Sequence, residues 1–88
     1  MKLTAVVKVK NRLGLHIRPA TVIVKMLQGC RSSVFFSLRD QTINAKSIMS
    51  LLVLAAQRNA KVTIVVEGED AESVLEKLIV GFEEQFGE

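Results

Sequence analysis

The chain has 88 residues, 49% of them hydrophobic and 24% charged, with a formal net charge of +3 at pH 7. This length predicts a single domain over residues 1–88, whose modest core buries roughly 60% of the surface that the unfolded chain exposes. No apolar run reaches the roughly 20 residues of a membrane span, and lysines interrupt the first residues where a signal peptide would be apolar. We therefore expect a cytoplasmic protein that does not insert into membranes.

Two further classes are disfavoured by the cysteine and histidine counts. Cys30 is the only cysteine, so an internal disulfide is impossible, and one cysteine with one histidine cannot form a usual structural zinc site. We expect neither a metal nor a cofactor.

The charge is unevenly distributed along the chain. Residues 1–66 hold eleven of the twelve basic residues and one acid, whereas residues 67–88 hold eight acids and one base. One interpretation is a solvated acidic face on a last helix, and another is a basic surface that meets an acidic or phosphorylated partner. The two interpretations are compatible.

Strand and helix patterns alternate from the start of the chain. Apolar residues at every second position predict a first strand, at Leu3, Ala5, Val7 and Val9. After a turn-like segment over 10–14, proline geometry predicts that a helix begins near Pro19, and Gly29 is a plausible stop. Its apolar face is expected at Ile23, Val24, Met26 and Leu27.

The second half of the chain predicts a hairpin, a helix, a strand and a long helix. Strands over 31–38 and 42–44 are joined by a tight turn at 39–41. A helix over 46–57 has Ser47 at its N-cap position, with an apolar side at Ile48, Leu51, Leu52 and Ala55. A fourth strand is expected at Val62, Ile64 and Val66, then a break at Gly68. Asp70 is expected to cap a last helix with a stripe of Ala71, Val74, Leu75, Leu78, Ile79, Phe82 and Phe86.

The resulting order, β-α-β-β-α-β-α, predicts an α+β fold, with a mainly antiparallel four-stranded sheet and helices on one side.

The segment GLHIRPA, residues 14–20, contains the only histidine and the only proline of the chain. His16 should lie just outside the helix start, where unpaired N–H groups and the helix dipole favour an anion. A metal is disfavoured because further ligands are missing. A hydrolytic dyad is disfavoured because no carboxylate lies nearby to orient the imidazole and the only thiol lies at the far end of the helix. Nucleophilic attack of His16 on phosphorus, with Arg18 holding the charge, fits better than these; a plain surface histidine is the alternative.

GLHIRPA resembles the active-site signature of the HPr family, the histidine phosphocarriers of the bacterial phosphoenolpyruvate-dependent sugar phosphotransferase system. The segment AKSIMSLL, residues 45–52, resembles the serine-site segment of the same family, and the likeness extends over the whole chain. It implies an open-faced β-sandwich, a four-stranded antiparallel sheet covered on one face by three helices.

The resemblance also implies roles by position, those of a carrier rather than a free-standing enzyme. His16 would accept a phosphoryl group on Nδ1 from enzyme I and pass it to enzyme IIA domains. Arg18 and the backbone N–H groups of Ile17 and Arg18 would support the phosphoryl group. Ser47 would be modified by HPr kinase/phosphorylase, unless it is a plain N-cap.

Three residues depart from the family pattern. Ile17 replaces a small residue, and Ser50 and Ala55 replace glycines. The last two changes predict a longer and firmer second helix, because glycine costs about 1 kcal/mol relative to alanine inside a helix.

A carrier must present one face to at least two proteins, and we expect a monomer that docks transiently. The candidate docking residues are Ile17, Thr21, Lys25, Ile48, Met49 and Leu52, with Arg18, Lys46 and Arg12 as a basic rim. Leu52 and Ile48 could instead belong to the core.

Two other functions compete with that of a carrier of the sugar branch. A phosphocarrier of the nitrogen branch, or a mainly regulatory HPr-like protein, would have the same fold. A small RNA-binding domain is disfavoured because its adjacent aromatics, Phe35 and Phe36, must point to opposite faces of a strand.

Overall fold

Four strands form one antiparallel sheet in the order β1-β4-β2-β3. The structure, a computed structural model, describes all 88 residues. The elements are β1 (Lys2–Lys8), α1 (Ile17–Leu27), β2 (Ser33–Leu38), β3 (Gln41–Asn44), α2 (Ile48–Leu54), β4 (Lys61–Glu67), α3 (Ala71–Glu83) and a short 3₁₀ turn, η1 (Gln85–Gly87). The predicted order and the α+β class are confirmed.

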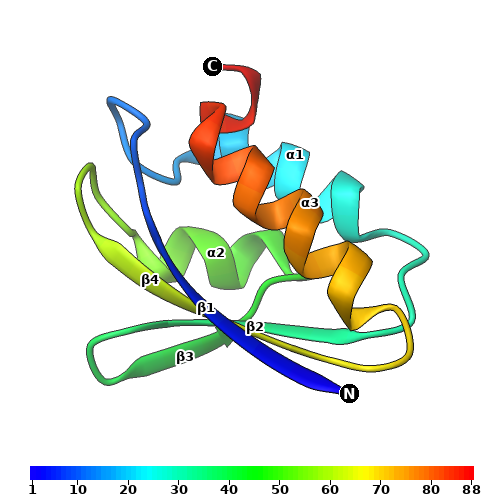
Figure 1. Cartoon of the computed structure of the whole chain (residues 1–88). Coiled ribbons are helices and arrows are strands. Elements are labelled where there is room, and N and C mark those ends of the chain that lie inside the picture. Colours follow the sequence, from blue (N-terminus) through cyan, green and yellow to red (C-terminus); the bar gives the residue numbers. More distant parts are fainter.

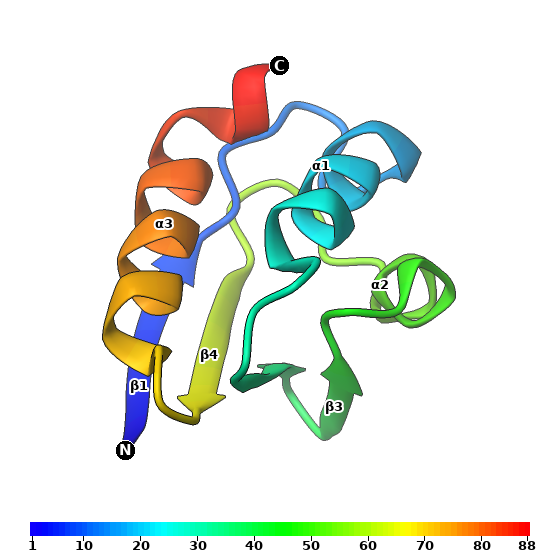
Figure 2. The same ribbon diagram turned by 90° about the vertical axis from the view of Figure 1, so that its right-hand side faces the viewer.

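The three helices cover one face of the sheet and leave the other face open (Figures 1 and 2). Burial alternates along the strands accordingly: Val34 and Phe36 of β2 are buried, whereas Ser33 and Phe35 between them are exposed. The predicted opposite orientation of the two phenylalanines is therefore confirmed. None of the helices is long and apolar enough to cross a membrane.

Helix α1 begins two residues earlier than the proline suggested. His16 is its N-cap, and Ile17, Arg18 and Pro19 are its first three residues. Pro19 is tolerated at the third position because an N–H there would have no helical partner. Arg18 is helical, although the residue before a proline is biased away from the helical conformation. The helix ends at Leu27, close to the predicted stop at Gly29.

Helix α2 is shorter than the predicted span of 46–57, and the expectation that Ala55 lies inside the helix is wrong. It has seven residues and ends at Ala55, which adopts the left-handed conformation with φ of 51°. Ala55 is exposed rather than on the apolar side, and Leu54 is buried in its place. Alanine at residue 55 therefore introduces backbone strain at a helix end instead of extending the helix.

Helix α3 carries the predicted apolar stripe with two differences. Leu78 and Phe82 are buried as expected, but Ile79 is 37% exposed, and Phe86 lies beyond the helix in η1. Asp70 occupies the N-cap position of α3, but its side chain makes no capping hydrogen bond to the helix. Its carboxylate accepts instead from the Arg31 N–H at 2.8 Å and the Ser32 hydroxyl at 2.5 Å, and so ties α3 to the α1–β2 loop.

After α3 the chain reverses direction. Gln85 and Phe86 are both left-handed, with φ of 56° and 51°. The Phe86 ring packs edge-on against Phe82 with centroids 4.9 Å apart, and it lies over Gly81, where any Cβ would collide with it. This reversal places the end of the chain beside the loop that leads into α1 (Figures 1 and 2).

Candidate functional site at the start of helix α1

The loop before α1 is held against the α2–β4 connection. Gly14 has φ of 69°, and a Cβ there would collide with the Ala56 carbonyl oxygen. The next residue, Leu15, is buried and donates its N–H to the same oxygen at 2.8 Å. Glycine is thus required by both conformation and space. The tight turn fixes the backbone on which His16 is mounted.

His16 lies at the N-terminus of α1 with its side chain 27% exposed. Its carbonyl oxygen accepts the Ala20 N–H at 3.0 Å, which closes the first turn. The N–H groups of Ile17 and Arg18 precede this bond and have no partner in the protein, and Pro19 has no N–H. Two unpaired donors and the positive end of the helix dipole therefore adjoin the imidazole, an arrangement that suits an anion.

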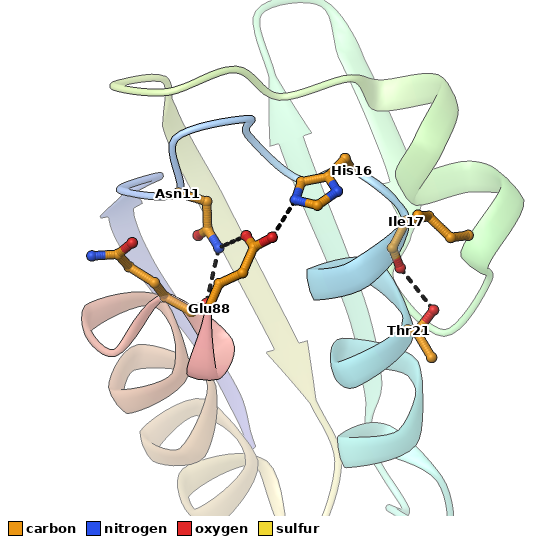
Figure 3. A network of polar contacts seen from close by, with 6 residues as sticks. Asn11, His16, Ile17, Thr21 and Glu88 are labelled. Carbon is orange, nitrogen blue, oxygen red and sulfur yellow. Dashed lines mark hydrogen bonds and ion pairs between the residues drawn. The ribbon is translucent and has the colours of Figure 1, made fainter.

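A carboxylate also contacts this imidazole. Glu88 Oε2 lies 2.5 Å from His16 Nε2, and Glu88 Oε1 accepts from Asn11 Nδ2 at 2.7 Å (Figure 3). Asn11 is fully buried and donates its second amide hydrogen to the Gln85 carbonyl oxygen at 2.9 Å. The inference that no carboxylate orients the imidazole is therefore wrong. No carboxylate is near His16 in the sequence, and Glu88 reaches it from 72 residues away only in the folded chain.

The electrostatics of Glu88 follow from these contacts. The hydrogen bond from Asn11 lowers the pKa of the Glu88 carboxyl most, and the hydrogen bond and charge of His16 lower it further. The charge of Arg18 acts in the same direction, so its guanidinium influences the site although it forms no ion pair. Partial burial opposes the shift. Glu88 is consequently ionised at neutral pH.

The candidate docking residues divide into exposed and half-buried groups. Ile17 and Met49 are 56% and 68% exposed, and Lys25 is exposed. Ile48 and Leu52 are half-buried and pack against the core. The remaining residue, Thr21, is half-buried too, and its hydroxyl donates to the Ile17 carbonyl oxygen at 2.7 Å (Figure 3). Each of them lies on α1 or α2, the two helices that flank the His16 loop.

Two exposed apolar residues near this region were not among the predicted ones. Leu13, in the loop before His16, is 71% exposed, and Val53 of α2 is 63% exposed. The sequence does carry a signal for Val53, because it follows Met49 by four residues and so lies on the same face of α2. For Leu13 the sequence gives no such signal, because the conformation of its loop is set by the contacts of Gly14 and Leu15.

Ser47 lies at the N-cap of α2, as predicted. Its Oγ accepts the N–H of Ser50 at 3.2 Å. This bond satisfies one of the free donors of the first turn. Ser47 is half-buried.

Comparisons with known proteins identify the family. The family model described as "PTS HPr component phosphorylation site" matches residues 3–84. The chain belongs to the HPr family. Phosphocarrier protein HPr of Chlamydia pneumoniae is 40% identical over 87 residues, which cover 99% of this chain and 81% of that protein.

Two further relatives agree with this assignment. The HPr-like protein Crh of Bacillus subtilis is 38% identical over 79 residues, covering 90% of this chain and 93% of Crh. The crystal structure of HPr-C-His from Thermoanaerobacter tengcongensis superposes with a TM-score of 0.93 at 31% identity, covering 98% of this chain and 97% of that one. The structure and this superposition confirm the open-faced sandwich.

Proposed function

We propose that the protein is a phosphocarrier that accepts a phosphoryl group on His16 from phosphorylated enzyme I and passes it to enzyme IIA domains. The observation that supports this most directly is the position of the imidazole, beside two unpaired N–H groups at the start of an 11-residue helix. Arg18 adds a permanent positive charge at the same place. Membership in the HPr family is a second, independent support for a phosphocarrier function. A cytoplasmic location is part of the same proposal.

The reaction needs no cofactor. A neutral imidazole nitrogen attacks the phosphorus of the donor phosphohistidine, a new N–P bond forms, and the bond to the donor imidazole breaks with its electron pair. The incoming group adds negative charge, which the free N–H groups of Ile17 and Arg18 and the guanidinium can stabilise through charge-assisted hydrogen bonds. The same chemistry in reverse delivers the group to an enzyme IIA.

Docking would use the exposed apolar residues around His16. Ile17 and Met49 are exposed, whereas large apolar side chains are usually buried, and methionine suits a surface that meets several partners. We extend the predicted surface to Leu13 and Val53 on the basis of their exposure. Exposed Lys25, Lys46 and Arg12 would steer acidic partners to it. Binding as a monomer stays a prediction.

A labelling experiment tests the carrier function. The protein is incubated with enzyme I and labelled phosphoenolpyruvate, alongside His16→Ala. We expect acid-labile label on the wild type and none on the variant. A properly folded wild-type protein that takes up no label, or a His16→Ala variant that labels equally well, contradicts the proposal.

A regulatory role is the second candidate, favoured by the similarity to Crh and by the geometry of Ser47. Phosphorylation there by HPr kinase/phosphorylase would add about two negative charges to the N-cap of α2, close to the proposed docking residues of that helix. Such a charge would repel acidic partners. Incubation with ATP and the kinase should label the wild type but not Ser47→Ala. Equal labelling of the two contradicts this role for Ser47.

A further inference from the structure

The Glu88 carboxylate is held from both sides. One oxygen, Oε2, contacts His16 and the other, Oε1, accepts from Asn11 (Figure 3). Asn11 cannot move easily, because it is fully buried and also bonded to the Gln85 carbonyl oxygen. The side chain of Glu88 is 22% exposed, so the contact lies at the surface of the protein and not in its core.

The contact defines which imidazole nitrogen carries the proton. An ionised carboxylate only accepts hydrogen bonds, and Glu88 is ionised at neutral pH, so His16 Nε2 must be the donor. In a neutral ring the other nitrogen, Nδ1, then has a free lone pair. Nδ1 makes no capping hydrogen bond to α1 and has no other partner in the protein. In Figure 3 it lies on the side of the ring turned away from Glu88.

We propose that Glu88, held by Asn11, is a positioning residue that fixes the proton of His16 on Nε2, so that the lone pair of Nδ1, the acceptor atom that the family resemblance implies, stays free. This inference rests on the proposed function and deepens it. In enzymes with a carboxylate–histidine pair, the carboxylate sets the tautomer and orientation of the imidazole by the same hydrogen bond. Here the oriented atom is the nucleophile itself.

The same contact serves both directions of transfer. When Nδ1 attacks, the N–P bond forms, the donor imidazole leaves with its electron pair, and the proton stays on Nε2 in its hydrogen bond to Glu88. The ring becomes a phosphorylated imidazolium, whose positive charge the carboxylate stabilises. When the phosphoryl group leaves for the next acceptor, the electron pair returns to Nδ1 and the ring is again neutral with its proton on Nε2.

Nuclear magnetic resonance of the single histidine tests the tautomer without any partner protein. With the ¹⁵N-labelled 88-residue chain, at a pH where the ring is neutral, we expect the wild type to hold its proton on Nε2. In Glu88→Ala we expect the population to move toward a mixture of both tautomers. Glu84→Ala is the matched control, because Glu84 is an exposed carboxylate four residues earlier whose side chain makes no hydrogen bond or ion pair. It should match the wild type.

Phosphoryl transfer from enzyme I gives the second readout. Glu88→Ala should lower the maximal rate of acceptance roughly ten- to a hundredfold, which corresponds to losing one charge-assisted hydrogen bond. The KM for enzyme I should change little, and Glu88→Gln, which retains an acceptor oxygen, should give an intermediate rate. A Glu88→Ala protein with the wild-type tautomer and rate overturns the inference while leaving the carrier function intact. A wild type that never labels overturns the carrier function, and the tautomer measurement still decides the role of Glu88.

Discussion

The ring of Phe86 lies over Gly81, in the space that a Cβ would occupy on any other residue. Gly81 is in the last turn of α3, and Phe86 is in the left-handed reversal that follows the helix. The contact lets the chain fold back after α3. Glu88 reaches His16 only because of this reversal, so the packing of two residues outside the site positions a carboxylate within it.

Replacing Gly81 by alanine tests this relationship. The added methyl group must displace the buried Phe86 ring, and we expect a loss of about 1–3 kcal/mol in the free energy of unfolding, typical of overpacking. Urea unfolding measures that loss. We also expect the ¹⁵N signals of His16 to change as they do in Glu88→Ala, because the reversal no longer holds Glu88 in place. An unchanged histidine spectrum in a destabilised Gly81→Ala protein shows that the reversal is not what places Glu88.

Ala55→Gly is expected to stabilise the protein. Ala55 ends α2 with φ of 51°, a conformation that costs a residue with a Cβ about 1 kcal/mol more than glycine. We therefore expect a gain of about 1 kcal/mol, measured by urea unfolding. Ala60→Gly is a suitable control, since Ala60 is not among the residues with positive φ. At residue 60 the substitution should lower the stability of the protein. Glycine there relieves no strain in the folded chain and increases the conformational freedom of the unfolded chain. If both variants lose stability, the strain assigned to Ala55 is absent.

Arg18→Ala is expected to slow phosphoryl acceptance while leaving the fold intact. The side chain is exposed and forms no ion pair, so stability should change by less than about 0.5 kcal/mol. The rate of labelling by enzyme I should fall roughly tenfold or more, because one charge-assisted contact to the phosphoryl group is lost. Arg39→Ala removes the same charge from the β2–β3 turn and should label normally. If Arg18→Ala and Arg39→Ala are labelled at the same rate, Arg18 has no specific contact with the phosphoryl group and acts only through the net charge of the protein.

Asp70 should make stability depend on pH in the acid range. The N–H of Arg31 is the main cause that lowers the pKa of the Asp70 carboxyl below 3.8, and the Ser32 hydroxyl adds to it. A lowered pKa means that the ionised form stabilises the fold above pH 3.8 and that this contribution is lost as the pH falls through the lowered pKa.

The Tm of the wild type and of Asp70→Asn, measured across pH, checks this dependence. At pH 7 the wild type should have the higher Tm, and the difference should close below pH 3.8. Glu69→Gln is the control, because the Glu69–Arg31 pair is largely exposed and such pairs contribute little. A Tm difference for Asp70→Asn that stays constant down to low pH contradicts the assignment.

The local features of this protein could be predicted from its sequence. Strand alternation, the apolar stripe of α3 and the N-cap at Ser47 depend on the order of neighbouring residues, and the structure has them. The start of α1 at Ile17 was predicted to within two residues, and with it the unpaired N–H groups beside the imidazole. Ala55 marks the limit of such reasoning, because helix propensity favours alanine but the turn into β4 imposes a left-handed end on the helix.

Only the tertiary structure determined what lies behind the imidazole. Glu88 is separated from His16 by 72 residues, and no periodicity or spacing connects the two. Their contact depends on the packing of Phe86 on Gly81 and on a buried asparagine, Asn11, that bonds to both Gln85 and Glu88. The physical reason is general. Hydrogen bonds within a helix or turn join near neighbours, whereas a side chain from a distant segment arrives only when the whole core has packed.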